Sequence, residues 1–230
     1  ILDIERPKLV KDLPGVTNED HVLAAEVQKE LMPTGSPSIE GFDIAGLSIP
    51  ASRTGGDYYD YLPIADDLLT ITIGECSGQG MAPAMMMASL RAYLRVISTS
   101  TMDVEETISQ ANRLITEDIQ DEEFIVTMMV AQIDQLTRSI RYASAGHQAH
   151  ILDRHGEVHV LHSTGMPMGM QPDTIIPEGT PHKLKSGDLL LLSTDGAQKM
   201  VSPSGEQFGI ERVLDVIRKN RNLPARMIVN

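Results

Sequence analysis

The sequence has few aromatic side chains and almost no cysteine. Tryptophan is absent, and the 230 residues include only three phenylalanines and one cysteine, Cys76. A single cysteine excludes a disulfide framework within the chain and fits a reducing, cytoplasmic setting. Hydrophobic residues still make up 41% of the chain, and 13 residues are methionines. We therefore expect an aliphatic, methionine-rich core, because methionine fills irregular gaps well.

Long apolar runs and a basic charge balance are also missing. No stretch of 18 apolar residues occurs, and the longest runs, such as 188–192, have the length of strands. No signal peptide is apparent. The formal charge is −13, whereas nucleic acid and anionic membranes attract basic surfaces. We therefore expect neither nucleic acid nor a membrane as a partner.

Residues 1–33 are predicted to form a linker followed by a helix. The helix begins with a pattern like a capping box at 17–20. Its apolar residues recur at every fourth position, at Leu23, Val27 and Leu31. Such a helix either packs on the following domain or joins that domain to an upstream sensory domain as a switch. We assign residues 34–230 to the domain itself.

The remainder of the sequence predicts many strands, with helices inserted in two blocks. Strands are expected around Phe42–Ile44, over 58–62, 68–73, 124–133 and 139–145, on both sides of 154–157, and over 189–193. A turn at 65–67 makes the second and third of these a hairpin. Helices are expected over 81–98, 103–115 and 208–219. Because strand–helix alternation of the βαβ kind is absent, we expect an α+β fold with helices packed on antiparallel sheets.

Three acidic residues share one context, next to a glycine at the end of an apolar strand or hairpin. They are Asp57, Glu75 and Asp195. Carboxylates at strand ends can converge, and burying them together is costly unless cations compensate. Oxygen ligands favour Mg²⁺ or Mn²⁺ over zinc, and two such ions can activate a water for attack on phosphorus. Asp-Gly and Gly-Asp pairs are also common in turns, so spacing alone leaves plain turns as an equal alternative.

The order of the motifs resembles the SpoIIE/RsbU branch of the type-2C, metal-dependent protein phosphatases (PPM), over about 22–218. Residues 55–60, Gly-Gly-Asp-Tyr-Tyr-Asp, are similar to the first metal motif of that family. Residues 74–80 are similar to its Gly-Asp-x-Ser-Gly-His-Gly motif. Further matching segments are 27–33, 82–90, 144–147, 165–169 and 193–196.

The resemblance implies an αββα sandwich, with two stacked antiparallel sheets flanked by helices. It implies a site for two ions, Mn²⁺ or Mg²⁺, bound by Asp57, Glu75, Asp195 and the main-chain carbonyl of Cys76, with no protein nucleophile. It also implies hydrolysis of phosphoserine or phosphothreonine on a phosphorylated anti-anti-sigma-like protein, in bacterial sigma-factor or stress signalling. We further expect an upstream sensory domain in the same chain and a homodimer.

Several other residues near these motifs are candidates for contacting the substrate or supporting the metal ligands. They are Arg53, Asp60, Gln79, His147 and Gly196. Arg53 either meets a phosphate or forms a surface salt bridge, and His147 either supports the site or is structural. The other histidines show no zinc-binding spacing. A catalytic thiol at Cys76 needs a basic environment, which the adjacent Glu75 argues against.

The sequence departs from the family pattern at three places. Glu75 stands where the family has aspartate, and Gln79 stands where it has histidine. The family also has a C-terminal strand with an Asp-Asp-x-Thr motif, which supplies a further metal ligand. The sequence ends at Asn230, before any such motif. A ligand misplaced by about 1 Å can cost on the order of a hundredfold in rate. The alternative function is therefore a catalytically weakened pseudophosphatase that acts as a protein-binding regulatory module.

Overall fold

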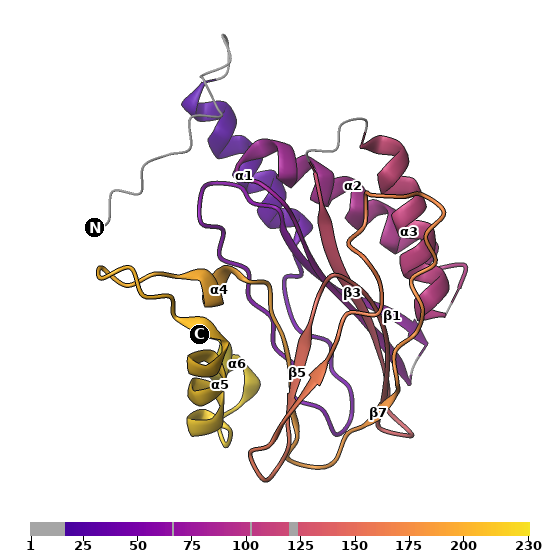
Figure 1. The fold of residues 1–230 in the computed structure, drawn as a ribbon, viewed down its shortest axis with the longest axis vertical. Coiled ribbons are helices and arrows are strands. Elements are labelled where there is room, and N and C mark those ends of the chain that lie inside the picture. Colours follow the sequence, from indigo (N-terminus) through magenta and orange to yellow (C-terminus); the bar gives the residue numbers. More distant parts are fainter. Residues whose placement is uncertain (1–16, 66, 102, 120–123) are drawn as a thin grey trace.

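Two antiparallel sheets lie face to face in the computed structural model, with helices on their outer sides (Figure 1). The structure describes residues 17–230 except 66, 102 and 120–123. The predicted linker therefore lies almost wholly outside the described residues, as does Asp66 of the predicted turn. The αββα sandwich and the α+β class are confirmed.

The large sheet has the strand order β1-β2-β3-β4-β7, and every neighbouring pair is antiparallel. Its strands are β1 (Asp57–Ala65), β2 (Leu68–Cys76), β3 (Val126–Asp134), β4 (Ser139–Ala145) and β7 (His182–Lys183). The predicted hairpin is confirmed, because β1 pairs with β2 along almost its whole length. The two-residue strand β7 was not predicted, since it is too short to show a period in the sequence.

The small sheet has the order β6-β5-β8 and is also antiparallel. Its strands are β5 (Ala149–Leu152), β6 (Val158–Leu161) and β8 (Leu189–Leu192). Inward-facing side chains of the two sheets, including Ile71, Met129 and Ile151, form one core cluster. A sandwich of two sheets holds together through such a cluster, because each sheet has an apolar face to remove from water.

The helices α2 (Met81–Ile97) and α3 (Val104–Asp118) cover the outer face of the large sheet (Figure 1). A second core cluster, which includes Met87, Ile108 and Met128, fills the space between them and the sheet. Asp103 caps α3 by accepting a hydrogen bond from the main-chain N–H of Glu106 at 3.0 Å. The methionine-rich aliphatic core expected from composition is therefore present.

The C-terminal helices are α4 (Gly196–Lys199), α5 (Gly209–Asn220) and α6 (Ala225–Val229). Helix α5 lies on the side of the small sheet away from the large one (Figure 1) and buries Leu214 and Ile217. Helix α5 was predicted within one residue at each end, whereas α4 and α6 were not predicted, because segments this short carry little periodicity.

Helix α1 (Asn18–Leu31) begins with the predicted capping box, formed between Thr17 and Asp20. Its apolar stripe is not buried: Leu23 is 59% exposed and Val27 is 58% exposed. The strand predicted around Phe42–Ile44 is wrong. Only an isolated bridge between Ile39 and Phe42 forms there, because neither sheet offers this segment a neighbouring strand to pair with. None of the helices in the described part of the chain is both long enough and apolar enough to cross a membrane.

Candidate metal centre

Two of the predicted ligands lie side by side at one end of the large sheet. Asp57 is the first residue of β1, and Glu75 is the second-to-last residue of β2. The register pairs them directly with each other, which places side chains on the same face about 5 Å apart. Tyr59 and Ile73 lie two residues away on the same face and pack into the core between the sheets. The two carboxylates therefore face the small sheet.

The third predicted ligand comes from the small sheet. Asp195 follows the end of β8 and precedes helix α4. The hydroxyl of its neighbour Thr194 donates a hydrogen bond to the Asp57 carboxylate at 3.3 Å. A Cβ atom placed on Gly196 would lie 3.9 Å from the same carboxylate. The fold thus brings the Asp57, Glu75 and Asp195 segments together from two sheets.

The electrostatics of this acidic group favour a cation. Burial, together with the nearby charges of Asp195 and Asp57, raises the pKa of Glu75 to about 7. Burial also raises the pKa of Asp57; the hydrogen bond from Thr194 opposes this rise, and the charge of Asp195 adds to it. Lys199, one turn along α4, forms an ion pair with Asp195. A site with mutually repelling carboxylates and oxygen donors fits a hard divalent ion.

The main chain at Cys76 adds a further oxygen beside the acids. A Cβ atom on Gly56 would lie only 2.3 Å from the Cys76 carbonyl oxygen. The Cys76 N–H donates to the Gly56 carbonyl at 3.1 Å. Only glycine allows the start of β1 to lie this close to the end of β2. The Cys76 side chain is buried, and burial raises the pKa of its thiol to about 11, which argues against a reactive thiolate.

His147 lies behind the acidic group, on the loop between β4 and β5. Its ring Nδ1 is 3.1 Å from the hydroxyl of Thr127, and Thr127 is the β3 neighbour of Glu75. Burial lowers the pKa of His147, which favours the neutral ring. The Nε2 atom is buried and has no hydrogen-bond partner within the described part of the chain. His147 is therefore held against β3 by Thr127, and it lies near Asp195, whose charge opposes the lowering of the His147 pKa.

The other candidates are placed differently. Asp60 lies on the opposite face of β1 from Asp57, because it stands three positions further along the strand and successive side chains alternate between faces. Its carboxylate accepts hydrogen bonds from Arg95 at 2.7 and 2.9 Å and from the Tyr58 hydroxyl at 3.2 Å. Asp60 thus links β1 to α2 on the face of the large sheet that the helices cover, and it does not face the acidic group. Arg53 and Gln79 are both exposed.

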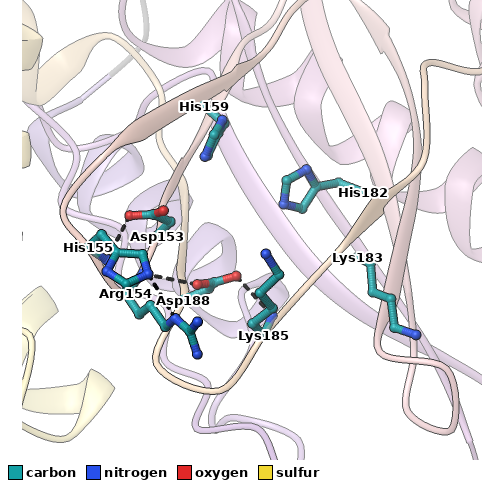
Figure 2. A pocket seen from close by; sticks show the side chains of 8 residues that line it. All are labelled: Asp153, Arg154, His155, His159, His182, Lys183, Lys185 and Asp188. Carbon is teal, nitrogen blue, oxygen red and sulfur yellow. Dashed lines mark hydrogen bonds between the residues drawn. The ribbon is translucent and has the colours of Figure 1, made fainter.

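A separate polar cavity was missed by the sequence analysis (Figure 2). Its volume is about 150 Å³, and its lining includes His159 and His182, whose rings are 5.8 Å apart. Two lining residues, Asp153 and His159, form a cluster with Glu157 in which the ligand atoms lie within 4.8 Å of one another. The hairpin between β5 and β6 produces this cluster, and its residues are mostly exposed.

This cavity is not the predicted site. Its lining residue Asp188 directly precedes β8, whereas Asp195 lies beyond the other end of that strand. The two acidic groups therefore lie at opposite ends of the small sheet. The spacing of 153, 157 and 159 around a predicted hairpin turn was the only signal that the sequence contained.

Comparison with known proteins agrees with this architecture. The family model described as Stage II sporulation protein E (SpoIIE) matches residues 65–230. Protein IcfG of Synechocystis sp. is 29% identical over 238 residues, which cover 92% of this chain and 37% of that protein. Phosphoserine phosphatase RsbU of Bacillus subtilis is 25% identical over 185 residues, which cover 80% of this chain and 54% of that protein. The chain therefore spans about half or less of these relatives.

A solved structure shows the same fold. The SiaA-PP2C domain of Pseudomonas aeruginosa has a TM-score of 0.78 at 21% identity, and the match covers 91% of this chain and 85% of that one. The two sheets, the flanking helices and the family match over most of the sequence lead to one assignment. The chain belongs to the SpoIIE family, the RsbU-like branch of the metal-dependent, type-2C serine/threonine protein phosphatases.

Proposed function

We propose that this chain hydrolyses phosphoserine or phosphothreonine on a regulatory protein, using two Mn²⁺ or Mg²⁺ ions. Asp57, Glu75, Asp195 and the Cys76 carbonyl would hold the ions. The observation that carries the proposal is the convergence of three carboxylates from two sheets, with the pKa values of Asp57 and Glu75 both raised. Such repulsion makes the site selective for a compensating cation.

The residues of the chain have binding and orienting tasks in this proposal. Bound divalent ions lower the pKa of water and so supply a nucleophile for phosphorus at neutral pH. Thr194 fixes the orientation of the Asp57 carboxylate through its hydrogen bond. Cys76 stays a protonated thiol, because burial raises its pKa to about 11. This supports a reaction without a protein nucleophile.

The substrate and partners are proposed from the relatives and the surface. The name of RsbU supports phosphoserine, and we propose a phosphorylated anti-anti-sigma-like protein as the partner in bacterial stress or sigma-factor signalling. The exposed Arg53 precedes the Asp57 motif and is our candidate for contacting the phosphate, with Gln79 as a second candidate. We also propose an upstream sensory domain and a homodimer, with α1 as the connection, in the cytoplasm.

The test is hydrolysis of a phosphoserine peptide and of p-nitrophenyl phosphate, with and without Mn²⁺. We expect Mn²⁺-dependent activity in the wild type and a loss of at least a hundredfold, roughly the cost of a displaced reacting group, in Asp57→Asn and in Asp195→Asn. Equal rates in the wild type and both variants would refute the site.

The matched control is Glu157→Gln, which removes one acid from the other cluster. Glu157 is exposed, so the rate should stay within about twofold of the wild type. Activity that depends on Glu157 and not on Asp57 would move the metal site to the cavity of Figure 2. A wild type that binds Mn²⁺ but hydrolyses neither substrate would instead support the binding-module alternative.

A further inference from the structure

Helix α1 is joined to the candidate metal centre by one side chain. Gln28 is the only residue of α1 that is buried, with 7% of its surface exposed. Its Nε2 donates to the carbonyl oxygen of Gly55 at 2.6 Å, and the Gly55 N–H donates to its Oε1 at 3.1 Å. In the described part of the chain, no other side chain of α1 hydrogen-bonds to a different element. The carboxamide therefore satisfies both main-chain groups of Gly55.

The segment that Gln28 holds leads directly into the first ligand. Gly55 lies two residues before Asp57, in a stretch over 51–56 that belongs to no helix or strand. A residue in a sheet has its main-chain groups fixed by neighbouring strands, but Gly55 has them fixed by Gln28 instead. The next residue, Gly56, packs against the Cys76 carbonyl. A shift of Gly55 would therefore move Asp57 relative to Cys76.

Apart from Gln28, α1 is fixed on the domain by partly buried side chains beside α2 and by Met32, which follows the helix and packs against the outer core cluster. Leu23 and Val27 are more than half exposed, so the helix buries little apolar surface. Elements with few buried apolar contacts are displaced at low cost in free energy. A force on α1 from the preceding chain would thus act on Gly55 through Gln28, while the two core clusters remain intact.

We propose that Gln28 is a positioning residue that sets the divalent-cation affinity of the centre by holding Gly55 in place. Displacing α1 would then weaken cation binding without unfolding the domain. This inference rests on the proposed metal centre, and it assigns the regulation of that centre to one side chain. It predicts that loss of the Gln28 carboxamide affects cation affinity more than global stability.

The experiment measures Mn²⁺ binding by calorimetry and the melting temperature in EDTA for the wild type, Gln28→Met and Lys29→Met. Methionine keeps the length of glutamine but makes neither hydrogen bond. We expect Gln28→Met to raise the Kd for Mn²⁺ about tenfold, the scale of one or two net hydrogen bonds. High Mn²⁺ should restore its turnover to near the wild-type value. Lys29 is exposed, so Lys29→Met should bind as the wild type does.

A second variant guards against a simple packing effect. Gln28→Asn keeps the amide, but its side chain is shorter by one bond, about 1.5 Å, so it should resemble Gln28→Met. Unchanged Kd values in both variants, or a lower melting temperature with an unchanged Kd, would overturn the positioning role. If Asp57→Asn bound Mn²⁺ as well as the wild type, the metal centre itself would be refuted, which is a separate outcome.

Discussion

Replacing Glu75 with glutamine should stabilise the metal-free protein at alkaline pH while removing its response to Mn²⁺. In the folded protein, burial and the charges of Asp195 and Asp57 raise the pKa of Glu75 from 4.5 to about 7. The folded state thus retains a proton that the unfolded chain has released between these pH values. Stability therefore falls as the pH rises through this window, and the loss is complete above about pH 7.

The size of the effect follows from the pKa. A rise from 4.5 to about 7 corresponds to roughly 3 kcal/mol, at about 1.4 kcal/mol per pH unit. Glu75 is only partly buried, and water screens part of this repulsion, so we expect about 2 kcal/mol. Glutamine carries no charge, so Glu75→Gln should gain this amount at pH 8 and little at pH 4.5, where the glutamate is protonated in the folded state and about half protonated in the unfolded chain.

Urea unfolding in EDTA at pH 4.5, 6 and 8 measures this difference directly. Addition of Mn²⁺ at pH 8 should stabilise the wild type, because a cation that binds only the folded state adds its binding free energy. It should stabilise Glu75→Gln much less. The exposed Glu157→Gln is the control and should match the wild type throughout. A Glu75→Gln variant no more stable than the wild type at pH 8, or one with the same advantage at every pH, would refute the reasoning.

Two further predictions concern packing around the centre. Gly56→Ala should weaken Mn²⁺ binding and cost about 1–3 kcal/mol of stability, because its methyl group would meet the Cys76 carbonyl oxygen at 2.3 Å; calorimetry and thermal unfolding test this, with Gly35→Ala, which meets nothing within 4 Å, as the control. Asp60→Ala should cost about 2 kcal/mol, because it removes the buried acceptor of the hydrogen bonds from Arg95, whose side chain is partly exposed to water. Urea unfolding measures that loss, and a cost below about 1 kcal/mol would contradict the structural role of Asp60.

Local patterns in the sequence were enough to predict most of the strands and helices. Alternation and turn residues located β1, β2 and β4, and the strand-end position of Asp57 and Glu75 followed from the same patterns. These features depend on neighbours in the sequence, so a single chain reveals them. The resemblance to a family supplied the stacking of the sheets.

Contacts between distant segments could not be predicted in this way. Strand alternation alone could have predicted the face of β1 on which Asp60 lies. It could not have predicted the partner of Asp60, because Arg95 is 35 residues away. Gln28 lies in the segment 27–33 that resembles the family, but the resemblance did not indicate its contact, which is with Gly55, 27 residues later. The prediction of a strand around Phe42 was wrong for the same reason, because a suitable pattern forms a strand only where a neighbouring strand is present to pair with it.

The origin of the three carboxylates has a mechanical consequence. Asp57 and Glu75 belong to the large sheet, and Asp195 follows strand β8 of the small one, so a cation held by all three would act as a cross-link between the layers. It would close a loop of about 120 residues between Glu75 and Asp195, and closing so long a loop removes much freedom from the unfolded chain. Sliding of one sheet over the other would break this cross-link. Occupancy of such a site would therefore report how the two layers are aligned.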